Sequence, residues 1–318
     1  MPRISALHAL RRSLRPASHL TLWLRYRAPY HWPSTLAFFA ARCIPGIETF
    51  SNGVYRRSYV HAGYHGLLEA RPVDGRWLQV CVTPTPLAQL PGLVARLRRV
   101  FDLDADPLRI AKALGQDPLM ARLLAARPGL RVPRGWDPFE QAMRTVLGQQ
   151  VSVAGAMTLA GRLVIRHGRP FQLQAPGLSH VFPPAAAVAS AQLDGLGMPR
   201  ARAATLATLA QALIDQPGLL RPGQPLAAAV DGLCRLKGIG PWSAHYLALR
   251  QVGADDALPL GDVALAKALR LLEGHEAQLA ERALAWRPWR AYAAQHLWAS
   301  LADVQPTSAD RPSPRRRN

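Results

Sequence analysis

Hydrophobic residues in the first third of the chain alternate with polar ones, which is the period of β-strands. In the segment WLQVCVTP, Leu78, Val80 and Val82 lie on one face, so we expect a strand covered on one side. SYVHAG and GLLEARPV have a similar character, and Asp74-Gly75 is a typical hairpin dipeptide between GLLEARPV and WLQVCVTP. The pattern predicts a group of strands that includes a hairpin.

Two stretches near these strands have helical spacing. Ser34 can cap a helix over TLAFFAARCI, and LAQLPGLVARLRRVF returns to a helical pattern. We therefore predict a small α+β domain over residues 21–112. Residues 1–20 are interpreted as a basic N-terminal extension, and residues 306–318 as a disordered basic tail, because they contain too few apolar side chains to order themselves.

Beyond about residue 113 the spacing is helical throughout. Asp137, Pro138 and Glu140 form a strong helix start, with a capping side chain, a proline in the first turn and a carboxylate three residues after the cap. The pattern predicts a helical region over 113–305 that follows the α+β domain. Its two expected subdomains cover about 138–254, and about 113–137 together with 255–305.

The segment LKGIGPWSAHY, residues 236–246, interrupts the helical pattern. Gly238 and Gly240 can take the positive φ angles of a sharp turn, and Ile239 between them would anchor the turn in the core. Pro241 suits the first position of a following helix. The sequence therefore predicts two helices joined by a tight hairpin.

The free amides at the start of the second helix would form an anion site, since they point outward with the helix dipole behind them. Lys237 and Ser243 would add donors at its edge. The alternative is an ordinary glycine cap followed by a proline-initiated helix. No GxxxxGK sequence follows, so a nucleotide-binding loop is excluded.

The charge of the chain favours DNA phosphate as the anion. The formal net charge is +19, and only three of the 39 basic residues are lysine. Arginine carries a permanent planar charge that suits phosphate. A basic surface typical of an arginine-rich proteome is the alternative.

Cysteine usage and hydropathy indicate a cytoplasmic protein. Cys43, Cys81 and Cys234 show no CxxC spacing, so they form no zinc or iron–sulfur site by themselves and fit a reducing cytosol. No apolar run approaches the ~18 residues of a membrane span. The arginines near the start resemble a transit peptide, but we favour a simple basic extension.

Asp262 lies about twenty residues after the hairpin, in LPLGDVALAKALRLL. It is expected to be the N-cap of a helix, a position that keeps a carboxylate ionised. A glycine hairpin followed by an aspartate at this interval is much more specific than either part alone.

These segments resemble the helix-hairpin-helix DNA glycosylases and, more narrowly, the family of DNA-3-methyladenine glycosylase II. The resemblance runs from about Leu22 to Gln305 and includes APYHWPSTLAFFAARCIPGIET, VPRGWDPFEQAMRTVLGQQVSVAGAMTLAGRL, LGMPRARA and WRPWRAYAAQHLW. It implies an α+β fold: a small mixed N-terminal domain followed by two mainly α-helical domains, with the active-site cleft between them.

The resemblance also assigns roles to residues of this chain. It places the catalytic aspartate at Asp262, the hairpin at Gly238, Ile239 and Gly240, the aromatic base pocket at Phe38, Trp242, Tyr246 and Trp298, and the residue wedged into the DNA at Gln150, beside Gln149. Two positions depart from the family pattern. Gln150 stands where an aliphatic wedge is expected, and Ala299 replaces a further pocket aromatic.

The implied function is that of a monofunctional glycosylase which removes alkylated, cationic purines from double-stranded DNA, without a cofactor and as a monomer. A lysine replaces Trp242 in relatives that also cut the strand, so no lyase activity is expected. The sequence leaves open whether a monovalent cation binds at the hairpin carbonyls. The alternatives are a glycosylase for other damaged bases and a non-catalytic protein that binds damaged DNA.

Overall fold

The computed structural model describes residues 19–74, 76–83, 86–275 and 278–303. The predicted tail and residues 1–18 of the predicted extension lie outside these residues. No described helix is both long and apolar enough to cross a membrane.

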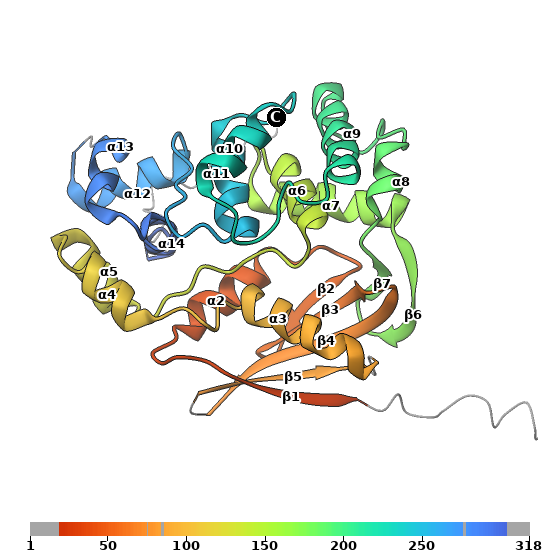
Figure 1. Ribbon diagram of the computed structural model, residues 1–318, viewed down its shortest axis with the longest axis horizontal. Helices are drawn as coiled ribbons and strands as arrows, with labels where there is room; N and C mark the ends of the chain where they lie inside the picture. Colours follow the sequence, from red (N-terminus) through yellow and green to blue (C-terminus); the bar gives the residue numbers. More distant parts are fainter. Residues whose placement is uncertain (1–18, 75, 84–85, 276–277, 304–318) are drawn as a thin grey trace, which may run out of the picture.

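The N-terminal part is built on a five-stranded antiparallel sheet with the strand order β1-β5-β4-β3-β2 (Figure 1). The strands are β1 (Leu20–Arg25), β2 (Glu48–Ser51), β3 (Val54–His61), β4 (Tyr64–Val73) and β5 (Trp77–Val82). Leu78, Val80 and Val82 are fully buried, whereas Trp77 is exposed. The predicted one-sided strand and the β4–β5 hairpin are therefore confirmed, but the edge strand β1 was not foreseen.

Two helices lie between the sheet and the helical part in Figure 1: α2 (Trp32–Ala40) and α3 (Leu90–Val100). The 3-10 turn η1 (Leu87–Gln89) precedes α3. Phe39 of α2 packs with Tyr55 of β3 and with Phe101 just after α3. The expected cap at Ser34 is wrong. The helix begins at Trp32, and His31 is the cap, because its Nδ1 accepts a hydrogen bond from the Ser34 amide at 3.4 Å.

The helical part is arranged in two groups. The first group consists of α6 (Pro138–Leu147), α7 (Val153–His167), α8 (Ala185–Ala189), α9 (Arg200–Asp215), α10 (Leu226–Cys234) and α11 (Pro241–Leu247). The second consists of α4 (Pro107–Leu114), α5 (Pro118–Ala126), α12 (Val263–Glu273), α13 (Leu279–Arg282), η3 (Ala283–Trp286) and α14 (Arg290–Ser300). The π-helical turn η2 (Ala248–Val252) continues α11 and connects the groups.

Each group has a hydrophobic core of its own. Met143, Val146 and Leu147 of α6 are fully buried in the first core, and Trp286 and Leu297 are fully buried in the second. The predicted start of α6 is confirmed, since the Asp137 side chain accepts hydrogen bonds from the first amides of this helix. The expected small α+β domain followed by a mainly helical region is confirmed.

One part of the helical region was predicted wrongly. Residues expected to be helical form a two-stranded hairpin, β6 (Arg169–Ala175) and β7 (Leu178–Val181). The sequence FQLQA alternates with the period of a strand. Phe171, Leu178 and Val181 are buried together against Leu67 of the main sheet. This hairpin therefore extends the contact between the sheet and the helices.

A buried cluster of four charged residues joins the sheet to α6. Arg57 of β3 donates to Glu140 at 2.7 Å and to Glu48 of β2 at 3.3 Å. Arg144, one turn after Glu140 on α6, lies 2.5 Å from Glu48 and 2.7 Å from Glu140. Glu140 thus pairs with two arginines and does not close a capping box. Because each charge has two opposite partners, removing one leaves an uncompensated buried charge.

This cluster predicts a pH dependence of stability. Burial opposes the ionisation of Glu140, but the charges of Arg57 and Arg144 outweigh it and lower the pKa of Glu140 from 4.5 to about 2. A lowered carboxyl pKa contributes stability above pH 4.5 that is lost as the pH falls through about 2. In denaturant titrations at neutral pH, Glu140→Gln should lower the free energy of unfolding by about 3 kcal/mol or more. Between pH 4.5 and 2 the variant should lose less stability than the wild type; equal losses would contradict this role.

Candidate active site

A cavity of about 300 Å³ opens where α2, α6, α11, α12 and α14 meet. It is lined by all five residues that the sequence predicts for the base pocket and the catalysis: Phe38, Trp242, Tyr246, Asp262 and Trp298. They come from positions that are up to 260 residues apart in the chain. The fold therefore brings together side chains that only the resemblance related to one another.

Asp262 is fixed by three hydrogen bonds. As the N-cap of α12, its Oδ1 accepts from the Leu265 amide at 2.9 Å. The same oxygen accepts from Trp298 Nε1 at 3.1 Å, and Oδ2 accepts from Trp242 Nε1 at 3.0 Å. A carboxylate has about four acceptor positions, so this arrangement holds the group rigidly and leaves room for one more partner. The two indole donors were not predicted from the sequence.

The aromatic rings have a defined mutual geometry. Trp242 and Tyr246, one turn apart on α11, are stacked with ring centroids 5.3 Å apart and planes 10° from parallel. Trp298 of α14 meets Tyr246 edge-on, at 6.0 Å and 72°. All three rings and Phe38 are partly exposed, which fits walls of an open cavity. Ala299, the position where a further aromatic was expected, is also partly exposed.

Arg250 is a residue of this cavity that the sequence analysis missed. Only 2% of its surface is exposed, and its guanidinium lies over the rings of Phe38, Trp298 and Tyr246 at 4.6, 5.1 and 5.4 Å. It donates to the carbonyl of Pro133 and to Gln295, both at 3.0 Å. The spacing offered a signal, because Arg250 follows Tyr246 by one helical turn.

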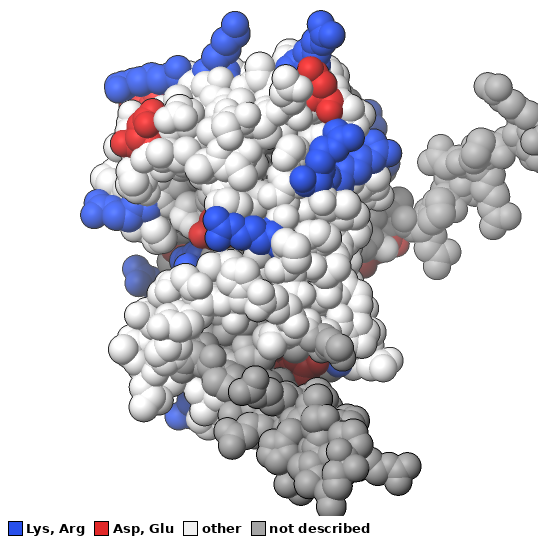
Figure 2. All heavy atoms as spheres, turned by 90° about the vertical axis from the view of Figure 1, so that its right-hand side faces the viewer, with Lys and Arg blue, Asp and Glu red and all other residues white. Residues whose placement is uncertain are grey.

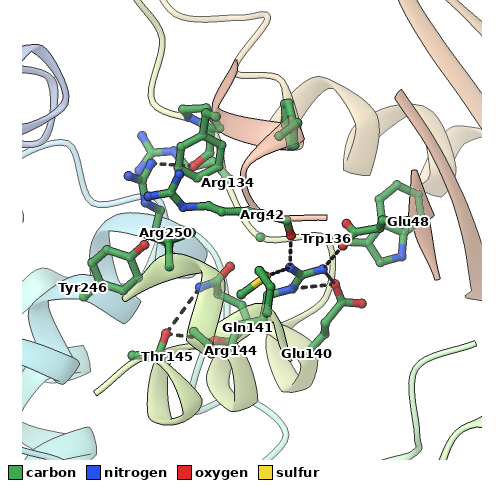
Figure 3. A pocket seen from close by; sticks show the side chains of 18 of the residues that line it. Arg42, Glu48, Arg134, Trp136, Glu140, Gln141, Arg144, Thr145, Tyr246 and Arg250 are labelled. Atoms are coloured by element: carbon green, nitrogen blue, oxygen red, sulfur yellow. Dashed lines mark hydrogen bonds and ion pairs between the residues drawn. The ribbon is translucent and has the colours of Figure 1, made fainter. Parts of the chain in front are cut away.

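Burial and neighbouring charges change the titration of these groups. Burial lowers the pKa of Arg250 to about 10, and the charges of Arg42 and Arg134 act in the same direction, whereas Tyr246 opposes them. Burial raises the pKa of Tyr246, but the charges of Arg250 and Arg42 outweigh it, so the net shift is downward. Figure 3 shows the guanidinium groups of Arg42, Arg134 and Arg250 gathered at one end of the cavity.

The other end of the cavity is polar. Glu48, Glu140 and Arg144 of the buried cluster line it, together with the amide of Gln141, which donates to Thr145 at 3.3 Å (Figure 3). The charged cluster that joins the domains therefore also shapes the floor of the cavity.

The hairpin has the predicted path with one correction. Gly238 has φ +88°, and a side chain there would collide with Thr205 of α9, so glycine is required. Gly240 does not take a positive φ: it is extended, with φ −91°, and caps α11, which begins at Pro241. Ile239 is buried as expected, and Lys237 is exposed.

The loop between α6 and α7 supports the hairpin. Gln149 Nε2 donates to the Gly238 carbonyl at 3.1 Å and to Ser243 Oγ at 2.9 Å, and Arg202 donates to the Gln149 carbonyl at 2.5 Å. Ser243 is only 3% exposed, so its side chain faces Gln149 and not the surface, where a donor was expected. Gln150, at the loop tip, is exposed and has φ +56°.

No group of three or more His, Cys, Asp or Glu residues within the described ranges could hold a metal ion. Whether the hairpin carbonyls bind a monovalent cation stays open. The Gly238 carbonyl accepts the bond from Gln149, and a carbonyl oxygen has a second lone pair.

Comparisons with known proteins identify the family of this chain. The family model of the AlkA N-terminal domain matches residues 21–137. DNA-3-methyladenine glycosylase 2 of Escherichia coli is 36% identical over 86% of this chain and 95% of its own length. The probable bifunctional transcriptional activator/DNA repair enzyme AlkA of Mycobacterium tuberculosis is 38% identical over 90% of this chain, which spans 58% of that relative.

A solved structure supports the fold. The 3-methyladenine DNA-glycosylase from Archaeoglobus fulgidus superimposes with a TM-score of 0.78 at 20% identity, over 90% of this chain and 100% of that one. The chain therefore belongs to the AlkA family of DNA-3-methyladenine glycosylases and has the helix-hairpin-helix glycosylase fold.

Proposed function

We propose that this protein is a monofunctional DNA glycosylase of base excision repair. It hydrolyses the N-glycosidic bond of alkylated purines, such as 3-methyladenine and 7-methylguanine, and leaves an abasic site. The observation that carries the proposal is the carboxylate of Asp262, held by Trp242 and Trp298 at 3.0 and 3.1 Å within an aromatic cavity. The proposal covers this chain and not the transcriptional role named for the longer relative.

The cavity suits a purine that has been rotated out of the duplex, the step that exposes a glycosidic bond to an enzyme. A purine alkylated on a ring nitrogen is cationic. Aromatic faces attract such a cation, with about 0.5–2 kcal/mol for a good contact. Trp242, which is partly exposed and lines the cavity, is the best surface for it, because Trp242 also holds Asp262 and so sets the distance between the base and the carboxylate.

Asp262 acts on the sugar. As the glycosidic bond breaks, the bonding electrons leave with the base and positive charge grows on the sugar ring. A fixed carboxylate stabilises this charge and orients the attacking water, from which it accepts a proton. One carboxylate is sufficient since the alkylated base is already a good leaving group, unlike the sugar leaving groups that require paired carboxylates.

Strand cleavage by a covalent mechanism needs an amine that forms a Schiff base with the sugar. Trp242 has none, and its only polar atom donates to Asp262. The product is therefore an intact strand with an abasic site.

The partner is double-stranded DNA, bound by a monomer in the cytosol. The hairpin amides and Lys237 grip phosphate without reading sequence. Gln150, exposed at the tip of the loop between α6 and α7 with φ +56°, would occupy the space that the rotated base leaves. The charge of +19 supports a polyanionic partner, and on the face shown in Figure 2 basic side chains are more prominent than acidic ones.

The catalytic role of Asp262 is tested with Asp262→Asn. Asparagine is an equally good helix cap, so the fold should be retained. Release of 3-methyladenine from alkylated duplex DNA should fall by about 100-fold or more, whereas DNA binding should change little. Unchanged release by Asp262→Asn would refute the mechanism. Failure of the wild type to release the base would refute the proposed enzymatic activity. Strand cleavage by the wild type without added base or lyase would contradict monofunctionality.

The phosphate role of the hairpin is tested with Lys237→Ala. The variant should bind duplexes of any sequence more weakly, and the slope of log K against log salt concentration should decrease by about 1. Lys112→Ala is the matched control, because this exposed lysine lies on α4, far from the hairpin in Figure 1. A loss confined to particular sequences, or an equal effect of both variants, would argue against phosphate anchoring.

A further inference from the structure

Three of the four rings expected to hold the damaged base already have a cation of the protein on them. Arg250 lies over Phe38, Tyr246 and Trp298 at 4.6 to 5.4 Å. The guanidinium of Arg42 adds a second contact to Phe38, at 4.1 Å. The fourth ring is that of Trp242, and among the described residues no guanidinium lies over it.

The cavity as a whole carries an excess of positive groups. Five arginines and three carboxylates line it: Arg42, Arg57, Arg134, Arg144 and Arg250 with Glu48, Glu140 and Asp262. Arg57 and Arg144 pair with Glu48 and Glu140, and Arg134 pairs with Asp255. Within the described part of the chain, Arg42 and Arg250 form no ion pair with a carboxylate. Asp262, which neutral indoles hold, offsets only one of these two charges, so the cavity keeps a positive excess.

Such a charge acts on any cation that enters. A ring attracts a cation through its negative faces, and a guanidinium bound to that ring competes for this attraction. Two cations in one partly buried cavity also repel each other, because water screens them incompletely. A neutral purine has the same stacking surface and suffers neither effect. The arrangement around Arg250 therefore weakens the selection of charged over neutral bases.

We propose that Arg250 is a specificity-determining residue that lowers the preference of the cavity for cationic over neutral purines. This inference rests on the proposed glycosylase function and names the substrate range of the same site. Arg250 acts through the rings that it contacts, so it is not assigned a catalytic role. Trp242, which carries no guanidinium, remains the stacking surface common to both kinds of base.

A purely structural role is the competing explanation, since Arg250 also ties the Pro133 carbonyl and Gln295 to η2. The two roles differ in their consequences. Loss of a structural tie slows the release of all bases alike. Loss of the charge changes the ratio between cationic and neutral bases.

The experiment uses two duplexes of one sequence, with 7-methylguanine or hypoxanthine at the same position, as the cationic and the neutral purine. Single-turnover rate constants for base release are measured for the full chain, and their ratio is compared between variants. Arg250→Met should raise the ratio of 7-methylguanine to hypoxanthine release by about tenfold over the wild type. Arg250→Lys keeps the charge and should leave the ratio within about threefold.

Arg109→Met is the matched control, because it removes an exposed guanidinium that lies over Trp289, a ring outside the cavity, at 5.6 Å. Its ratio should equal that of the wild type. If Arg250→Met does not fold, Arg42→Met removes the other unpaired charge from Phe38 and should raise the ratio in the same direction.

The outcomes separate the two proposals. A ratio that is unchanged or lowered in the folded variants, even with slower release of both bases, overturns the specificity role of Arg250. Release of neither base by the wild type overturns the glycosylase function itself.

Discussion

The site depends on the pair of hydrogen bonds that hold Asp262 between two tryptophans. Trp242 lies in the first turn of α11, Trp298 belongs to α14, and Asp262 caps α12. Their indole donors reach different oxygens of one carboxylate, so three helices must be in place before the group is fixed. The same indoles form part of the aromatic cavity. Base binding and the orientation of the carboxylate are therefore parts of a single packed unit.

The rest of the fold fixes the position of this unit relative to the sheet. Phe38 reaches the cavity from α2 of the N-terminal part, and the buried cluster of Glu48, Arg57, Glu140 and Arg144 fixes that part against α6. Gln149, from the loop after α6, braces the hairpin through the Gly238 carbonyl and Ser243. The surface proposed to grip phosphate and the cavity proposed to receive the base are thus connected by direct contacts.

Local patterns and motif spacing predicted what depends on neighbouring residues. The one-sided strand β5, the start of α6 at Asp137 and the turn at Gly238 follow from alternation, capping and glycine chemistry. The β6–β7 hairpin was missed, although FQLQA alternates, because the helical pattern around it dominated the interpretation. Long-range contacts could not be predicted: nothing local shows that Trp298 donates to Asp262, that Glu140 pairs with Arg57, or that the Arg250 guanidinium lies over the rings.

The most direct test of this account is the single-turnover rate of alkylated base release by Trp242→Phe. Phenylalanine keeps an aromatic face in the cavity but removes the donor to Asp262 Oδ2. A hydrogen bond to a charged group contributes about 1.5–3 kcal/mol, so the rate constant should fall by about tenfold or more while DNA binding is retained. Trp289→Phe, which alters an indole outside the cavity, should have no such effect. An unchanged rate in Trp242→Phe would show that the indole donor does not position the carboxylate.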